Sequence, residues 1–117
     1  MVAIFEHRNI EKNDLGGPLK FPGKIDDILT NLSPNDRRNL STDNSSELPV
    51  KDDQGNTHKL TVEKKGNGYI CFTKGWKEFI KKKDITKDDK ISLYKEDDDN
   101  PGSGAQYSIK VEKAIYP

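Results

Sequence analysis

The sequence predicts a mainly β, α+β protein, built as a small open β-barrel with two or three short helices. Two observations carry this prediction. Short segments with strand-like alternation recur along the chain, and polar, glycine-containing turns separate them, which is typical of a small barrel. One such segment, residues 69–73, is followed by an amphipathic helical pattern and then by another strand pattern. At 117 residues the chain has the length of a single domain, residues 1–117.

The composition indicates a small core and extensive polar surface. Apolar residues make up 31% of the chain and charged residues 34%, so few side chains are available for burial. The single cysteine, Cys71, excludes a framework of internal disulfide bonds, and no apolar run has the length of a signal peptide or a membrane span. We therefore expect an intracellular protein in a reducing compartment.

Several short segments have the composition and alternation of β-strands. The alternation is clear near the end of the chain, where Tyr107, Ile109 and Val111 are separated by polar residues. Pro49 cannot donate a hydrogen bond to a neighbouring strand, so we expect its segment to be an edge strand. The predicted strands are residues 2–5, 19–22, 48–50, 58–63, 69–73, 91–94 and 107–112.

The clearest helical signal follows residue 75. Trp76, Phe79 and Ile80 lie at positions i, i+3 and i+4, so they share one face of a helix that packs on the sheet. If Gly75 is the N-cap, Glu78 falls in the first turn and three lysines fall in the last turn, as the helix dipole favours. Trp76 is therefore expected in the core.

Two further short helices are expected earlier in the chain. Residues 25–29 carry apolar side chains at helical spacing. Ser33 can cap a second helix that runs to about Leu40, with Pro34 at its first position.

The polar segments between these elements are expected to be loops. Residues 11–18 contain turn residues and two consecutive glycines, and residues 41–47 are polar without periodicity. Residues 64–68 are charged and glycine-containing, and residues 96–104 are acidic and then rich in glycine and serine. The three aspartates at 97–99 match no calcium-binding loop, so we expect a solvated loop there.

The stretch from residue 73 to residue 91 resembles the core of the plant B3 DNA-binding domain. That family has a strand, then Thr-Lys-Gly-Trp, an apolar pair, and a Gly-Asp turn before the next strand. The residues in this register are Thr73-Lys-Gly-Trp76, Phe79-Ile80, Ile85, Asp89 and Ile91. Asp88 stands where the family has glycine, so we expect a left-handed turn at this aspartate. The resemblance implies a pseudobarrel of about seven strands.

The resemblance also implies a partner and the loops that bind it. B3 domains bind double-stranded DNA through two loops in the major groove, the N-arm and the C-arm, which correspond here to about residues 11–18 and 64–69. The N-arm is shorter than is usual in the family. We expect Asp14 to fix this loop rather than contact a base, because aspartate readily accepts backbone hydrogen bonds in turns. The candidate DNA contacts are Arg8, Lys12, Asn13, Lys20, Lys64, Lys65, Asn67, Tyr69 and Lys74.

The function that the resemblance implies is sequence-specific DNA binding as part of a plant transcription regulator in the nucleus. Other transcription regulators are a further expected class of partner.

The charge pattern leaves two functions open. The formal net charge is zero, whereas DNA-binding domains are usually basic. Residues 59–83 carry eight lysines against two acidic residues, and the blocks 26–53 and 84–100 each carry seven acidic residues against three basic ones. The basic block favours one side that faces an anion. The zero net charge and the acidic loops favour the alternative, a B3-like module that binds another protein and has weak or no DNA affinity.

No residue pattern points to catalysis or to a metal site. His7 and His58 are the only histidines and Cys71 is the only thiol, and a cysteine within a strand is usually a small packing residue. No cysteine and histidine have zinc-binding spacing, and no phosphate-binding Gly-Lys-Ser/Thr loop is present. We therefore expect no enzyme activity, no cofactor and no bound metal.

Overall fold

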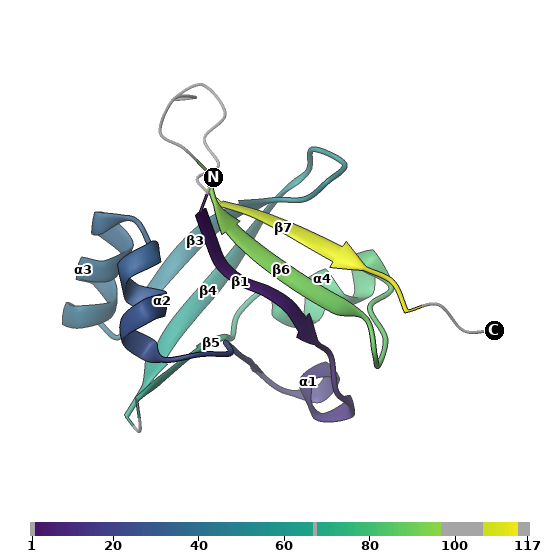
Figure 1. Ribbon diagram of the computed structural model, residues 1–117, viewed down its shortest axis with the longest axis horizontal. Coiled ribbons are helices and arrows are strands. Elements are labelled where there is room, and N and C mark those ends of the chain that lie inside the picture. Colours follow the sequence, from purple (N-terminus) through teal and green to yellow (C-terminus); the bar gives the residue numbers. More distant parts are fainter. Residues whose placement is uncertain (1, 67, 97–106, 115–117) are drawn as a thin grey trace.

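The structure is a computed structural model that describes residues 2–66, 68–96 and 107–114. The described residues form one seven-stranded sheet that curls into an open barrel (Figure 1). The strands are β1 (Val2–Asn9), β2 (Leu19–Lys20), β3 (Ser45–Lys51), β4 (Thr57–Lys65), β5 (Tyr69–Phe72), β6 (Lys90–Lys95) and β7 (Tyr107–Glu112). Their order is β1-β6-β7-β3-β4-β5-β2, and β3 and β7 are the parallel pair. The predicted fold class is confirmed.

Four helices accompany the sheet within the described residues. They are α1 (Lys12–Gly16), α2 (Ile25–Asn31), α3 (Pro34–Thr42) and α4 (Trp76–Lys83). α2 packs against β1 and α3 packs against β3, and both helices lie at the left of Figure 1. α4 packs against β4, and α1 contacts α4. α2, α3 and α4 were predicted, whereas the prediction of a loop at 11–18 is wrong because α1 lies within it.

β1 and β2 follow each other in the chain but lie at opposite edges of the sheet. The connecting residues 10–18 therefore cross the open side of the barrel. Ile10 anchors the start of this crossing, because its side chain is fully buried. The Ile10 N–H donates to the Asp89 carbonyl and the Asp88 N–H donates to the Ile10 carbonyl, both at 2.8 Å. The N-arm thus takes part in closing the barrel.

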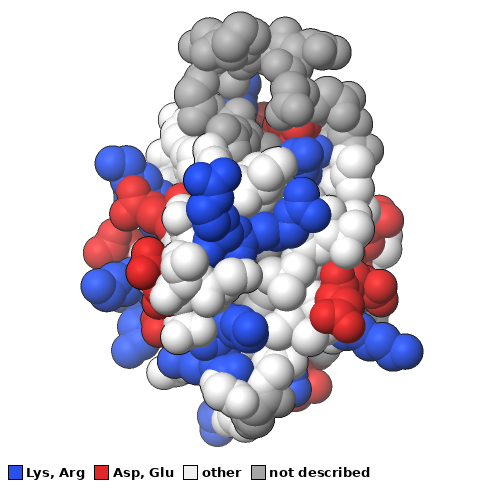
Figure 2. Space-filling view, turned by 90° about the vertical axis from the view of Figure 1, so that its left-hand side faces the viewer, with Lys and Arg blue, Asp and Glu red and all other residues white. Residues whose placement is uncertain are grey.

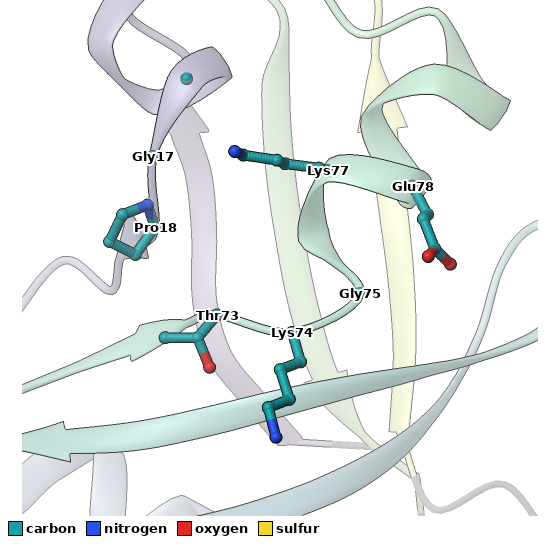
Figure 3. Close-up of a pocket in the computed structure, with 8 residues that line it drawn as sticks. Gly17, Pro18, Thr73, Lys74, Gly75, Lys77 and Glu78 are labelled. Atoms are coloured by element: carbon teal, nitrogen blue, oxygen red, sulfur yellow. The ribbon is translucent and has the colours of Figure 1, made fainter.

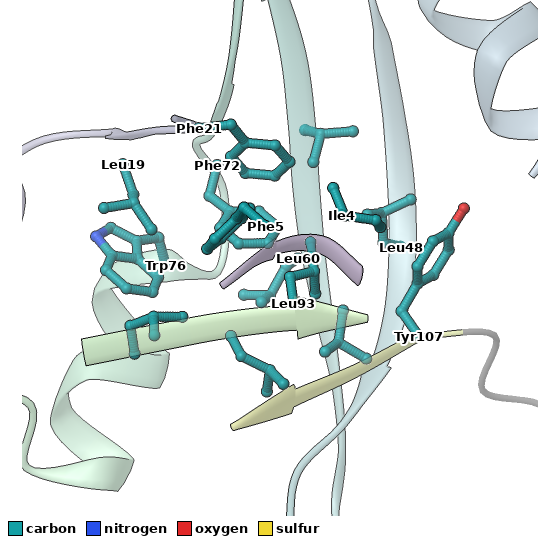
Figure 4. Close-up of a cluster of buried hydrophobic side chains, with 14 of the residues drawn as sticks. Ile4, Phe5, Leu19, Phe21, Leu48, Leu60, Phe72, Trp76, Leu93 and Tyr107 are labelled. Carbon is teal, nitrogen blue, oxygen red and sulfur yellow. The ribbon is translucent and has the colours of Figure 1, made fainter. Parts of the chain in front are cut away.

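A row of aromatic rings runs through the core (Figure 4). The Phe5 ring of β1 lies 4.9 Å from the ring of Phe21, which lies 4.7 Å from that of Phe72 in β5. Phe72 in turn stacks on Trp76 of α4 at 6.0 Å between ring centroids. Aromatic pairs at such separations stabilise a core beyond the area they bury. The row connects Phe5 of the edge strand β1 to Phe21, which directly follows the other edge strand, β2. The core therefore holds the two edges of the sheet together.

The start of α4 has the geometry that the sequence predicts. Gly75 is the N-cap and has a left-handed φ of 87°. A Cβ at this position would lie 2.4 Å from the backbone oxygen of Lys59, so only glycine fits without a shift. Trp76 is fully buried, which confirms its predicted place in the core. Asp88 has a φ of 74°, and the left-handed turn predicted there is confirmed.

The chain around β3 differs from the prediction. Residues 41–47 are not a loop, because α3 extends to Thr42 and β3 begins at Ser45. Ser46 is buried and its hydroxyl donates to the Asp36 carboxylate at 2.6 Å, a tertiary contact that local propensity does not report. β3 is also not an edge strand, since it lies between β4 and β7, although it pairs with β7 only beyond Pro49, at Val50 and Lys51.

Ser92 of β6 is a smaller deviation from the predicted alternation. Simple alternation places Ser92 in solvent, yet it is 1% exposed. Its hydroxyl accepts a hydrogen bond from the backbone N–H of His7 at 2.9 Å, where the pairing of β1 with β6 is irregular. The irregular pairing therefore buries a polar residue that the strand pattern places outside.

Two predictions fall partly outside the described residues. The acidic loop at 96–104 is described only at Glu96, and Asn67 of the C-arm is not described. Within the described chain, no helix is long and apolar enough to cross a membrane.

Asp89 fixes the turn before β6 to the segment after β7. Its carboxylate is almost fully buried and accepts hydrogen bonds from Lys113 Nζ at 2.7 Å, the Ala114 N–H at 2.8 Å and the Thr86 N–H at 2.9 Å. Burial alone would raise the pKa of Asp89, but these hydrogen bonds outweigh it and lower the pKa to about 2. Asp89 therefore stabilises the fold in its ionised form.

Replacing Trp76 by alanine should destabilise the protein by about 3 to 5 kcal/mol, because it removes a fully buried ring and leaves a cavity. A loss of this size approaches the total stability of a small domain. Thermal unfolding followed by circular dichroism measures it. Lys77→Ala, on the exposed side of the same helix, is the control and should melt close to the parent. A Trp76→Ala variant that also melts near the parent would contradict the packing of α4.

Replacing Asp89 by asparagine should destabilise the protein at pH 7 by about 2 kcal/mol, and the effect should vanish in acid. The folded-state pKa is lower than the ordinary value of 3.8, so the stabilisation is complete above that value and is lost as the pH falls towards 2. Urea unfolding of parent and variant at several pH values measures the difference. A difference that stays constant down to pH 2 would show that the ionised Asp89 is not its source.

Candidate nucleic-acid interface

α1 is a single helical turn inside the N-arm, and Asp14 organises it. The Asp14 carboxylate accepts a hydrogen bond from the backbone N–H of Glu11 at 2.8 Å, which gives a partner to a free donor at the start of the helix. Asp14 is 8% exposed, whereas Lys12 and Asn13 of the same turn are exposed. The prediction that Asp14 fixes this segment is confirmed.

Arg8 of β1 binds other parts of the protein rather than extending into solvent. Its Nη1 and Nη2 donate to the two carboxylate oxygens of Asp14, each at 3.1 Å, and its Nε donates to the Lys20 carbonyl of β2 at 3.1 Å. Nη1 also donates to the Asn9 carbonyl. The Arg8 side chain is 19% exposed. Arg8 thus bridges β1, α1 and β2.

The indole of Trp76 holds α1 from the side of the core. Its Nε1 donates to the backbone carbonyl of Asp14 at 2.9 Å, in a buried position. A buried indole N–H without a partner would cost free energy, so this bond also satisfies the polar atom of the ring. Asp14 therefore accepts hydrogen bonds from Arg8 at its carboxylate and from Trp76 at its backbone carbonyl.

The pairing of β2, β5 and β4 places the end of the N-arm beside the C-arm. Lys20 pairs with Cys71, and Cys71 pairs on its other side with Glu63. Paired residues of antiparallel strands point to the same face, and Tyr69 shares that face because it lies two residues before Cys71. Lys20 Nζ lies 4.9 Å from the centroid of the Tyr69 ring, a cation–π contact. The two arms thus meet on one outer surface.

An acidic residue lies among the lysines of this surface. The carboxylate of Glu63 is 3.6 Å from Lys65 Nζ. The nearby Thr73 hydroxyl, and after it the charges of Lys65 and Lys74, hold the pKa of Glu63 below its usual value. Glu63 is therefore ionised at neutral pH and offsets part of the basic charge. We name as the arm face the surface formed by Lys20, Glu63, Lys65, Tyr69 and Lys74.

The C-arm is the turn between β4 and β5. Gly68 has a φ of 85° and donates its N–H to the Lys65 carbonyl at 3.0 Å, a conformation that favours glycine. The backbone N–H of Lys64 donates to the Asn44 carbonyl at 2.8 Å, which braces the C-arm against the connection between α3 and β3. Lys64 makes no ion pair with any described residue. The residues that line a pocket of about 300 Å³ here are Asn44, Lys64, Lys65, Gly66 and Gly68.

A groove of about 590 Å³ separates the N-arm from the start of α4. Figure 3 shows the Lys77 side chain extending towards Gly17, whereas Lys74 points away from the N-arm. Both lysines are exposed. Glu78 also lines the groove, so the groove carries charges of both signs.

Charged side chains are unevenly distributed on the flank that carries α2 and α3. Figure 2 shows basic side chains through the middle of this flank and a mixture of acidic and basic side chains towards both margins. Arg37 and Arg38 of α3 are exposed and form no ion pair within the described part of the chain. The net charge of zero therefore includes local surfaces of both signs.

Comparison with known proteins places this geometry among known folds. No family model matches the chain. The chain is 40% identical over 50 residues to a protein of Arabidopsis thaliana that is named as B3 domain-containing, and the match covers 43% of this chain and 42% of that protein. Among solved structures, the chain is similar to Arabidopsis FUS3 in its complex with DNA, with a TM-score of 0.66 and 15% identity over 97% of this chain and 99% of that chain. The chain has the fold of a B3 domain.

The predicted resemblance to the plant B3 domains is thereby confirmed in sequence and in fold. The match spans less than half the length of the curated B3 relative. The residues proposed to contact DNA stay predictions, since the likeness to the solved structure concerns the fold.

The B3 fold brings most of the candidate contacts together. The candidates on the arm face are Lys20, Lys65, Tyr69 and Lys74. Lys12 and Asn13 lie on the exposed side of α1, and Lys64 lies in the C-arm pocket. Arg8 lies in β1, bonded to Asp14 of the N-arm, and Asn67 is outside the described residues.

The contacts that join the arms have no signal in the sequence. Arginine with aspartate and lysine with tyrosine are common pairs, but neither spacing nor pattern selects Arg8 with Asp14 or Lys20 with Tyr69. Lys20 meets Tyr69 because the sheet places β2 against β5. Arg8 meets Asp14 because α1 forms directly after β1. Only Glu63 could have been found, because alternation along β4 puts it on the same face as Lys65.

Proposed function

We propose that this domain binds double-stranded DNA through the N-arm and the C-arm, as part of a nuclear transcription regulator. The observation that carries the proposal is the meeting of the two arms on the arm face, next to lysines whose charges are not paired. Lys12, Lys64 and Lys74 make no ion pair with described residues, and DNA phosphates attract such side chains. The similarity to FUS3, whose solved structure is a complex with DNA, adds support.

The chemistry of the two arms supports different roles. The C-arm offers lysines and a glycine-containing turn, which suit phosphate contacts that position a protein on the duplex. The N-arm exposes Lys12, which can donate to guanine, and Asn13, which can pair with adenine in the major groove. Base selectivity is therefore proposed for the N-arm and general affinity for the C-arm. None of these roles requires a catalytic group.

A fluorescence-anisotropy titration with a random duplex pool at two salt concentrations tests the proposal. DNA binding through lysines should weaken steeply as salt rises. Little binding at either concentration would contradict the proposal and favour the alternative, a B3-like module that binds a protein, which the zero net charge supports.

Replacing Lys64 and Lys65 together by glutamine should weaken binding to all duplexes alike. Each phosphate contact removed should lower the slope of log K against log salt by about 0.9. The anisotropy titration, repeated over a salt series, measures the slope. Lys110→Gln is the matched control and should leave the slope unchanged. Lys110 is exposed on β7, a strand that Figure 1 shows away from α1 and from the turn between β4 and β5. A double variant with the parent's slope would refute the role of the C-arm.

Replacing Asn13 by alanine should weaken binding to the preferred duplex by about 1 to 3 kcal/mol and have much less effect on random DNA. Selection from a random pool provides the preferred duplex, and competition titration measures both affinities. Asn35→Ala, an exposed asparagine of α3, is the control and should change neither. Equal losses on both duplexes would make Asn13 a positioning contact, and no loss on either would exclude base reading by this residue.

A further inference from the structure

We infer that Arg8 determines base selectivity without touching DNA. Its hydrogen bonds hold α1 and β2 in one fixed arrangement, so that the base-contacting residues of the N-arm are in place before DNA binds. The inference rests on the proposed DNA binding of the N-arm. It assigns Arg8 a positioning role, in place of the direct DNA contact that the sequence suggested. We name the group formed by Arg8, Asp14, Trp76 and the Lys20 carbonyl the Arg8 clip.

The directions of its hydrogen bonds argue that Arg8 faces the protein. Two nitrogens of its guanidinium group hold both oxygens of the Asp14 carboxylate, and the third holds the Lys20 carbonyl. A planar guanidinium makes such a paired contact, whereas the ammonium of lysine cannot. Four of the five N–H groups of Arg8 are engaged in these bonds and in the bond to the Asn9 carbonyl. A phosphate could therefore take a paired contact from Arg8 only by displacing partners that shape the N-arm.

α1 needs such a clip to exist. Five residues are too few for a helix to be stable in water by itself, and Gly16 and Gly17 at its end favour other conformations. Its order must therefore come from tertiary contacts, which converge on Asp14 from Arg8 and Trp76. With the clip intact, Lys12 and Asn13 are held in one place before DNA arrives, which lowers the entropy cost of binding.

The same clip connects the two arms. By holding the Lys20 carbonyl, Arg8 fixes the strand from which the Lys20 side chain reaches the Tyr69 ring. A change at Arg8 should therefore loosen the N-arm and its contact with the C-arm together, while leaving Lys64 and Lys65 of the C-arm in place.

The decisive variant is Arg8→Lys, because it keeps the charge and removes the paired hydrogen bonds. The affinity ratio between the preferred duplex and the random pool should fall about tenfold, the factor for one net charge-assisted hydrogen bond. The affinity for the random pool and the salt slope should stay those of the parent. In the free protein, amide hydrogen exchange of residues 12–16 should become faster.

Two further variants isolate the clip. Asp14→Asn should reproduce the lower ratio, and the double variant Arg8→Lys with Asp14→Asn should lose no more than either single variant, because both remove the same contact. Arg38→Lys on α3 is the matched control, as Arg38 is exposed and outside the clip, and it should change nothing.

The outcomes separate this inference from the proposed function. If Arg8→Lys keeps the parent's affinity ratio and exchange rates, the clip has no role. If Arg8→Gln lowers the salt slope by about 0.9, Arg8 is a phosphate contact, and the inference fails while DNA binding stands. If Asp14→Asn strengthens binding to every duplex alike, Asp14 acts only by repulsion, which also overturns the inference. A parent that binds no duplex would refute the proposed function itself.

Discussion

The open side of the barrel is the constraint on which the arrangement of this domain depends. β1 and β2 are consecutive in the chain but form opposite edges of the sheet, so the segment between them has to cross the gap. Ile10 is held at the start of the crossing by the turn before β6, and Arg8 bridges to β2 at its end. The aromatic row from Phe5 to Trp76 supports the crossing from within. The same contacts therefore close the barrel and place the N-arm.

Buried carboxylates join separate elements of the fold in this chain with few apolar residues. Asp36 accepts hydrogen bonds from Ser33, Ser46 and Tyr107, and so joins α3 to the sheet. Asp52 lies between His58 and Lys83, at 2.8 and 2.7 Å, and joins the turn before β4 to α4. Burying such groups costs desolvation energy, which only well-placed partners offset, so each carboxylate favours the one arrangement of the elements that supplies those partners.

These internal pairs also bear on the zero net charge. Arg8 with Asp14, Lys83 with Asp52 and Lys113 with Asp89 cancel one another within the fold. The field at the arms then depends on the lysines that remain unpaired there, set against Glu63 and the acidic residues nearby. A net charge of zero is therefore compatible with a local surface that attracts an anion.

The sequence predicts best where the structure is local. Gly75 and the apolar spacing after it predict α4, and Asp88 predicts the left-handed turn before β6. Both features depend only on neighbours within a few residues. Residues 41–47 were misjudged because Ser46 owes its place to Asp36, a contact that polarity alone does not suggest. α1 was missed for the same reason, since its order comes from Arg8 and Trp76. The arm face could not be predicted as a surface, because it exists only once β2 pairs with β5.

The central claim is that the two arms act together on duplex DNA, and amide hydrogen exchange with and without saturating duplex tests it most directly. The account predicts slower exchange with DNA in both residues 11–20 and residues 64–70, and no change in residues 52–58 at the other end of β4. Protection confined to one arm would show that the arms do not act as a pair. Protection of residues 52–58 alone would place the DNA on a different surface and contradict the account.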